Sequence, residues 1–255
     1  MKIYRIDISG VSTYAIESDG FLFPATSDSL TDIAAGLSEH LDERIPLAEA
    51  VLLPPVTPGK IVAVGRNYAD HAKELGNAVP SEPILFMKPP SAIVGPGMDI
   101  VRPASSDRVD FEGELGLVIG TKARNIRAAE WEDFVLGFTC VNDVTARDLQ
   151  RRDVQFTRGK SFDTFCPVGP CIATRLDVSD LPLVTRVNGE TRQSGRTSQM
   201  IFGPGALLEF ITSIMTLEVG DLILTGTPAG VGPLVHGDRV EVEIEGIGTL
   251  RNPVQ

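Results

Sequence analysis

Glycine and proline interrupt the apolar runs of this chain at short intervals, and this punctuation limits the fold more than any other feature. The 255 residues include 25 glycines and 18 prolines. Apolar runs of roughly four to eight residues bounded by turn residues indicate strands. Such runs are KIVAVG, PILFMK, ELGLVIG, VLGFTCVND, DLILTG and RVEVEIEGIGTLRNPV. Strands outnumber helices and lack the regular alternation with helices of a doubly wound sheet. We therefore predict an α+β fold dominated by a rolled or barrel-like sheet.

Local signals place several elements within this fold. Asp19-Gly20 and Asn188-Gly189 each separate two strand-like runs and predict hairpins. A short helix is expected within 29–43, capped at Ser29 or Thr31. Longer helical patterns are expected at 67–76, 127–135, 145–153 and 203–215.

The chain divides at its most proline-rich segment. LLPPVTPGK contains three prolines and precedes the strand-like run KIVAVG. We predict a small, β-rich N-terminal module over residues 1–56 and a larger domain over residues 57–255.

Composition narrows the class of protein. The formal charge of −11 argues against a nucleic-acid partner, because phosphate binding requires clustered lysine and arginine. No run approaches the roughly 20 apolar residues of a membrane span, and no signal peptide is evident, so we expect a cytoplasmic protein without a membrane partner. The three cysteines have no CxxC spacing and are expected to be reduced and buried.

Two carboxylates lie close together in the run VDFEGELGLVIG, residues 109–120. If this run is one strand, Glu112 and Glu114 point to the same face, about 6.6 Å apart. At an effective dielectric constant near 20, their repulsion is on the order of 2–3 kcal/mol. A solvated strand face is the ordinary explanation of such a pair. The small or apolar neighbours indicate an interior strand instead, where a hard divalent cation would remove the repulsion.

A third carboxylate follows the next strand-like run. Asp143 ends VLGFTCVND, directly before the helical pattern TARDLQRRD. It is equally well explained as a cap of that helix or as a third metal ligand, and one residue can serve both roles.

His71 and Glu74 are three residues apart on an expected helix and therefore share a face. A carboxylate that orients an imidazole makes histidine a competent general base near neutral pH. The alternative is a polar surface of a short helix. His40 and His236 are both expected at the surface.

Two further segments carry polar groups. Lys160 follows a glycine and precedes an aromatic-rich segment, which suits a cation held near carboxylates or an anionic substrate. LILTGTPAGVGP lacks the spacing of a phosphate loop, but Thr225, Thr227 and backbone NH groups could hold a carboxylate.

In this order and spacing, the motifs resemble the fumarylacetoacetate hydrolase superfamily. The resemblance runs from about Lys60 to Val254 and is carried by GRNYADHAKE, SEPILFMKP, EGELGLVIG, NDVTARDLQ, GKSFDTFCPVGP, VNGETRQ with TSQMIF, and GDLILTGTPAGVGP. It implies a Mg²⁺ or Mn²⁺ enzyme on a mixed β-roll fold, present as a homodimer.

The resemblance also implies site residues by their positions in these motifs. They are Glu112, Glu114 and Asp143 as metal ligands, His71, Glu74 and Lys160 as catalytic residues, and Arg147, Gln150 and Thr227 as substrate contacts. Asp70 aligns with a fourth metal carboxylate of the long eukaryotic-type hydrolases. Asp70 is not among the metal ligands that the resemblance implies here, because short members of the superfamily have three protein ligands.

The implied substrate is a small 2-oxo acid that chelates the metal. We expect hydrolysis of a 2,4-dioxo acid of the acylpyruvate or fumarylpyruvate type, with C–C cleavage through a metal-bound enolate. Oxaloacetate decarboxylation is a close alternative, as is isomerisation or decarboxylation of 2-hydroxyhepta-2,4-diene-1,7-dioate in aromatic catabolism. A non-catalytic, metal-dependent ligand-binding protein is a further alternative of a different class.

Overall fold

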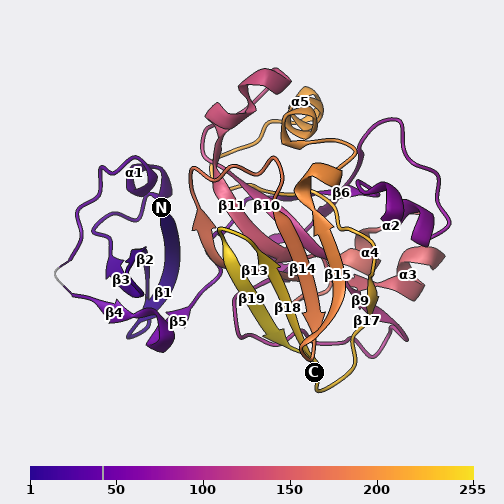
Figure 1. The fold of residues 1–255 in the computed structure, drawn as a ribbon, viewed down its shortest axis with the longest axis horizontal. Coiled ribbons are helices and arrows are strands. Elements are labelled where there is room, and N and C mark those ends of the chain that lie inside the picture. Colours follow the sequence, from indigo (N-terminus) through magenta and orange to yellow (C-terminus); the bar gives the residue numbers. More distant parts are fainter. Residues whose placement is uncertain (42) are drawn as a thin grey trace.

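A mixed twelve-stranded sheet organises the molecule (Figure 1). The computed structural model describes residues 1–41 and 43–255. Along the sheet, the strands are β4 (Ile45–Pro46), β3 (Phe21–Pro24), β2 (Val11–Ser18), β1 (Lys2–Ile8), β13 (Cys166–Ala173), β11 (Val135–Asn142), β10 (Gly113–Ile119), β16 (Leu222–Leu224), β6 (Ile61–Gly65) and β7 (Ile84–Lys88), with β5 (Val51–Leu52) beside β1 and β8 (Ile93–Val94) beside β13. Most pairs are antiparallel, whereas β16–β6 and β13–β8 are parallel.

Two smaller sheets complete the strand structure. One contains β15 (Glu190–Arg196), β14 (Pro182–Val187), β18 (Arg239–Ile244) and β19 (Gly248–Pro253), and the other contains β12 (Thr145–Ala146), β9 (Val109–Phe111) and β17 (Gly232–Pro233). The predicted α+β class is confirmed. Within the described residues the two ends of the large sheet do not pair, so the sheet does not close into a barrel.

The helices are few and short. They are α1 (Leu30–Ala34), α2 (Ala69–Glu74), α3 (Arg147–Arg152), α4 (Thr157–Lys160) and α5 (Pro204–Ile214), with 3-10 turns η1 (Leu47–Glu49), η2 (Pro90–Ala92), η3 (Ala128–Phe134) and η4 (Thr197–Gln199). In Figure 1, α2, α3 and α4 gather at the edge of the molecule opposite the N-terminal strands. No helix in the described part of the chain is long and apolar enough to cross a bilayer.

The large sheet buries apolar side chains on both of its faces. Leu115, Leu117 and Ile119 of β10 pack with Leu183 and Val242 of the four-stranded sheet. Val118 points the other way and joins a second core with Ile3 and Ile33. Apolar burial on both faces identifies β10 as an interior strand, as its sequence predicted.

The N-terminal strands extend this sheet. Lys2 and Ile3 of β1 pair with Ala173 and Ile172 of β13. The hairpin predicted at Asp19-Gly20 joins β2 to β3, and that at Asn188-Gly189 joins β14 to β15; all four turn residues have positive φ. The division into residues 1–56 and 57–255 stays a prediction.

Three local predictions need correction. The strand predicted over 109–120 is interrupted at Glu112, because β9 belongs to the three-stranded sheet and β10 to the large sheet. The helix expected within 29–43 is only Leu30–Ala34; its cap is Ser29, which accepts a hydrogen bond from the Asp32 amide. The pattern at 127–135 forms a 3-10 helix rather than an α-helix. Asp42, within the helix expected over 29–43, lies outside the described residues.

Candidate metal centre and active site

Strand register brings the acidic triad together. Glu114 lies on β10, Glu112 lies at the break between β9 and β10, and Asp143 directly follows β11. Antiparallel pairing sets Gly113 against Asn142, and the Asp143 amide donates to the Glu112 carbonyl at 2.8 Å. The three side chains therefore converge although they come from separate segments of the chain.

The triad fits a divalent cation by its donor chemistry. Glu112, Glu114 and Asp143 each offer a carboxylate oxygen, and these oxygens lie within 4.8 Å of one another. All three residues are buried, with at most 4% of their surface exposed. Buried carboxylates need positive charge nearby, and hard oxygen donors are the ligands that Mg²⁺ and Mn²⁺ prefer.

Asp143 is not the cap of the following helix. Helix α3 begins at Arg147, and its N-cap position is Ala146. Of the two explanations open at the sequence level, the cap is therefore wrong, and Asp143 faces Glu112 and Lys160 instead.

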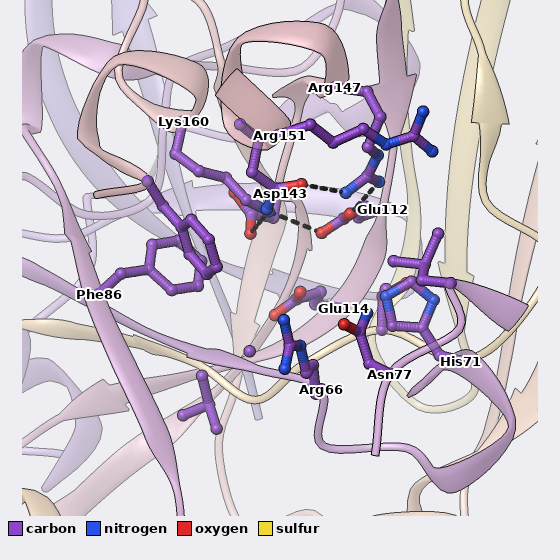
Figure 2. A pocket seen from close by; sticks show the side chains of 16 residues that line it. Arg66, His71, Asn77, Phe86, Glu112, Glu114, Asp143, Arg147, Arg151 and Lys160 are labelled. Atoms are coloured by element: carbon purple, nitrogen blue, oxygen red, sulfur yellow. Dashed lines mark hydrogen bonds and ion pairs between the residues drawn. The ribbon is translucent and has the colours of Figure 1, made fainter. Parts of the chain in front are cut away.

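Buried cations balance two of the three carboxylates (Figure 2). Lys160 Nζ donates to Glu112 Oε2 at 2.8 Å and to Asp143 Oδ2 at 2.6 Å. Burial by itself would raise the pKa of Glu112, but the charges of Lys160 and Arg147 outweigh it and hold that pKa well below its usual range. Burial by itself would lower the pKa of Lys160, but the negative charges of Asp143 and Glu112 outweigh burial and raise that pKa.

Glu114 is balanced differently. It accepts a hydrogen bond from the Gly226 amide at 2.7 Å, and among the described residues no cationic side chain forms an ion pair with it. Burial, then the charges of Asp143 and Glu112, raise the pKa of Glu114 well above its usual value. Glu114 is thus the carboxylate that gains most from a bound cation.

Helix α2 carries the predicted dyad. His71 Nδ1 lies 3.3 Å from Glu74 Oε2, and the Gly230 amide donates to Glu74 Oε1 at 3.1 Å. His71 is 4% exposed. The turn before the helix is fixed by Asn67, whose amide donates to the carbonyls of Thr225 at 2.8 Å and Phe202 at 2.9 Å.

A cavity of about 290 Å³ connects these groups. Of the nine predicted site residues, eight line it; the ninth, Glu74, is outside the lining and contacts His71. Asp70 is also outside the lining, with 79% of its side chain exposed. His40 and His236 are exposed, and all three cysteines are buried and free, as predicted.

The residues predicted to contact substrate are tied into the protein framework. Arg147 pairs with Glu112, and it donates to Asp110 at 2.9 Å and to Gln150 at 2.6 Å. Thr227 donates to the Gly113 carbonyl at 2.8 Å and accepts from Gln193 at 2.7 Å. Their role toward substrate stays a prediction.

Several site residues were not found from the sequence. Lys88 Nζ donates to Asp143 Oδ1 at 2.6 Å with its side chain fully buried. Its signal was present, because Lys88 ends the apolar run PILFMK on the same face as Phe86. Cavity-lining Arg66, Asn77 and Arg151 had no such signal, since polar residues in short loops and helices are ordinary.

Known proteins are similar in sequence to most or all of this chain. Protein Rv2993c of Mycobacterium tuberculosis is 55% identical over 259 residues, covering 100% of this chain and 98% of that protein. The mitochondrial oxaloacetate tautomerase FAHD2A of Homo sapiens is 47% identical over 223 residues, covering 82% of this chain and 71% of that protein.

Solved structures also resemble this chain over its whole length. The 5-carboxymethyl-2-hydroxymuconate delta-isomerase of Mycobacterium smegmatis superposes with a TM-score of 0.91 at 44% identity, over 100% of this chain and 99% of that one. The fumarylacetoacetate hydrolase of Exiguobacterium antarcticum superposes with a TM-score of 0.88 at 40% identity, over 100% and 99% of the two chains. The family model for the C-terminal domain of fumarylacetoacetate hydrolase matches residues 60–255. The chain therefore belongs to the fumarylacetoacetate hydrolase family.

Proposed function

We propose that this chain is a metal-dependent enzyme that moves a proton at C3 of a small 2-oxo acid, with His71 as the acid–base residue. One observation carries the proposal: the dyad histidine and the buried acidic triad line the same cavity. Glu112, Glu114 and Asp143 would hold Mg²⁺ or Mn²⁺. When bound, that cation would polarise the C2 carbonyl and offset the negative charge that develops on its oxygen.

The dyad prepares His71 for proton transfer. Glu74 accepts from Nδ1, and the Gly230 amide fixes Glu74, so a neutral imidazole keeps Nε2 free to take a proton. Lys160 adds fixed positive charge, which stabilises the enolate left when C3 loses its proton. Return of the proton to the C2 oxygen completes a keto–enol tautomerisation. This requires no water, and the names of the tautomerase and isomerase relatives support it.

Hydrolysis of a 2,4-dioxo acid is the second candidate, and the hydrolase from Exiguobacterium antarcticum supports it. His71 would take a proton from water, and the hydroxide would add to C4. The C3–C4 bond would then break, releasing a carboxylic acid and the enolate of pyruvate, which is protonated at C3. Loss of CO₂ from oxaloacetate would leave the same enolate.

A substrate panel separates these reactions. Enol-oxaloacetate, acetylpyruvate and fumarylpyruvate are incubated with the protein and Mg²⁺, with and without EDTA. Metal-dependent decay of enol absorbance without pyruvate indicates tautomerisation. Pyruvate from oxaloacetate indicates decarboxylation, and pyruvate from a 2,4-dioxo acid indicates hydrolysis. Ligand binding without turnover of any substrate would contradict the proposal and support the binding-protein alternative.

Replacing His71 by Asn tests the acid–base role. We expect kcat to fall about 10²–10⁴-fold, because a positioned acid–base residue contributes that much. Mg²⁺ affinity, measured by calorimetry, should stay that of the wild type. His236→Asn is the control, since His236 is exposed and outside the cavity. Equal loss of turnover and Mg²⁺ affinity would contradict the assigned role.

The predicted homodimer and cytoplasmic location belong to this proposal as well. Light scattering of the purified protein tests the first, and cell fractionation tests the second.

A further inference from the structure

The cavity contains more positive charge than its own carboxylates balance. Four cationic side chains line it against the three carboxylates of the triad: Arg66, Arg147, Arg151 and Lys160. Arg147 is paired with Glu112 and with Asp110, which lies outside the lining, and Lys160 is paired with Glu112 and Asp143. A divalent cation on the triad would increase the excess by two charges. Such a cavity favours a ligand with more than one negative charge.

Arg66 and Arg151 differ from the other two cations. In the part of the chain that the structure describes, neither forms an ion pair or a side-chain hydrogen bond with the protein. Arg151 is exposed on α3, where water screens its charge, whereas Arg66 is half-buried. Arg66 is therefore the unpaired cation that would attract a bound anion most strongly.

The backbone holds Arg66 in place. It directly follows Gly65, the end of β6, and has a φ of 57°, which is uncommon for a residue with a Cβ. The next residue, Asn67, is fully buried and makes three hydrogen bonds, to the carbonyls of Phe202 and Thr225 and from the Phe202 amide. The left-handed residue thus sits on an anchored turn.

The cations lie on two sides of the triad. Figure 2 shows Arg66 and Asn77 on one side of Glu114, and Lys160, Arg147 and Arg151 on the other. A 2-oxo acid held at the triad by its C1 carboxylate and C2 oxygen would have one end free. A second carboxylate at that end could reach the side of the cavity that Arg66 occupies.

We propose that Arg66 is a specificity-determining residue that pairs with a second carboxylate of the substrate, so that the site prefers 2-oxo dicarboxylates over 2-oxo monocarboxylates. The planar guanidinium can donate two parallel hydrogen bonds to a carboxylate, and the Asn77 amide can donate another. This inference rests on the proposed binding of 2-oxo acids at the triad.

Two ligands of equal chain length test Arg66 without requiring turnover. Oxaloacetate and 2-oxobutyrate differ in a terminal carboxylate in place of a methyl group. Their affinities for the Mg²⁺-loaded protein are measured by competition against oxalate in calorimetry. We expect the wild type to bind oxaloacetate about tenfold more tightly or better, since a charged hydrogen bond supplies that factor.

The variants then assign the preference to one side chain. Arg66→Gln should remove the preference and leave 2-oxobutyrate binding unchanged, while Arg66→Lys should retain part of it. Arg152→Gln is the matched control, because Arg152 is an exposed arginine of α3 outside the cavity lining. It should keep the full preference.

Three results would overturn the inference, and they differ in what else they contradict. If the wild type binds both ligands equally, or if Arg66→Gln weakens both equally, only the role of Arg66 is wrong. If the Mg²⁺-loaded wild type binds neither ligand nor oxalate, the proposed function is wrong as well.

Discussion

At the scale of single residues, the three carboxylates of the triad are unequal. Lys160 is shared by Glu112 and Asp143, and Lys88 adds a second cation to Asp143. Among the residues that the structure describes, the Gly226 amide is the only hydrogen-bond partner of the Glu114 carboxylate. A buried charge without a partner is destabilising, so Glu114 stays protonated to a higher pH than an ordinary carboxyl in the metal-free protein.

The variant Glu114→Gln isolates this effect. Because folding raises the pKa of Glu114 above 4.5, its contribution to stability is present below that value and is lost as pH rises through the folded pKa. Glutamine cannot ionise. The metal-free variant should therefore gain stability relative to wild type as pH rises above 4.5, measured by urea unfolding in EDTA.

Metal dependence completes the test of Glu114. Mg²⁺ should raise the melting temperature of the wild type, since a ligand that binds only the folded state stabilises it. Glu114→Gln should show little of this increase. Glu190→Gln, an exposed carboxylate outside the site, is the control and should behave as wild type throughout. An unchanged Mg²⁺ response in Glu114→Gln would contradict its role as a ligand.

At the scale of elements, the loop after β16 contacts both the triad and the turn before α2. Gly226 has a φ of 94°, and a Cβ there would lie 2.8 Å from the Cβ of buried Asn67. Its amide holds Glu114, and the neighbouring Thr227 hydroxyl holds the Gly113 carbonyl. One loop thus positions both a triad member and the anchored turn before α2.

Gly226→Ala tests the close packing of this loop. The control is Gly237→Ala, because Gly237 has a similar φ of 92° and open space around its Cβ position. Both variants carry backbone strain, but only the first also crowds a neighbour. We expect Gly226→Ala to cost about 1–3 kcal/mol more in unfolding free energy and to weaken Mg²⁺ binding. Equal losses in both variants would exclude a packing role.

At the scale of the whole molecule, the N-terminal strands share a sheet and a core with the site-bearing strands. Ile3 of β1 is fully buried and packs in the core that contains Val141 and Leu222. Through β13 and β11, the sheet connects β1 to the strands that present the triad. The N-terminal residues therefore support the scaffold of the site without lining its cavity.

Ile3→Ala measures this support. Deleting a buried isoleucine side chain to alanine costs about 2–5 kcal/mol. One unfolding transition at lower temperature is expected, with turnover at 25 °C unchanged. Val11→Ala on β2 is the control, since Val11 is 63% exposed. A separate early transition, with the main one unshifted, would show that the N-terminal module unfolds independently.

Much of this protein was readable from its sequence because the signals are local. Asp19-Gly20 and Asn188-Gly189 predicted hairpins, since turn geometry depends on the two residues themselves. Two glutamates in an apolar run predicted buried charge, and a histidine three residues from a glutamate predicted the dyad. The order and spacing of the motifs predicted the family.

Only the tertiary structure decided which distant groups meet. The break at Glu112 follows from β9 and β10 joining different sheets, and Lys88 reaches Asp143 across 55 residues of chain. Arg66 lines the cavity from a turn in which it has a left-handed backbone conformation and the next residue, Asn67, is anchored to the Thr225 carbonyl. Local propensity acts over a few residues, whereas strand register and burial depend on the whole core. The sequence therefore determined the chemical groups of the site, and long-range packing determined their partners.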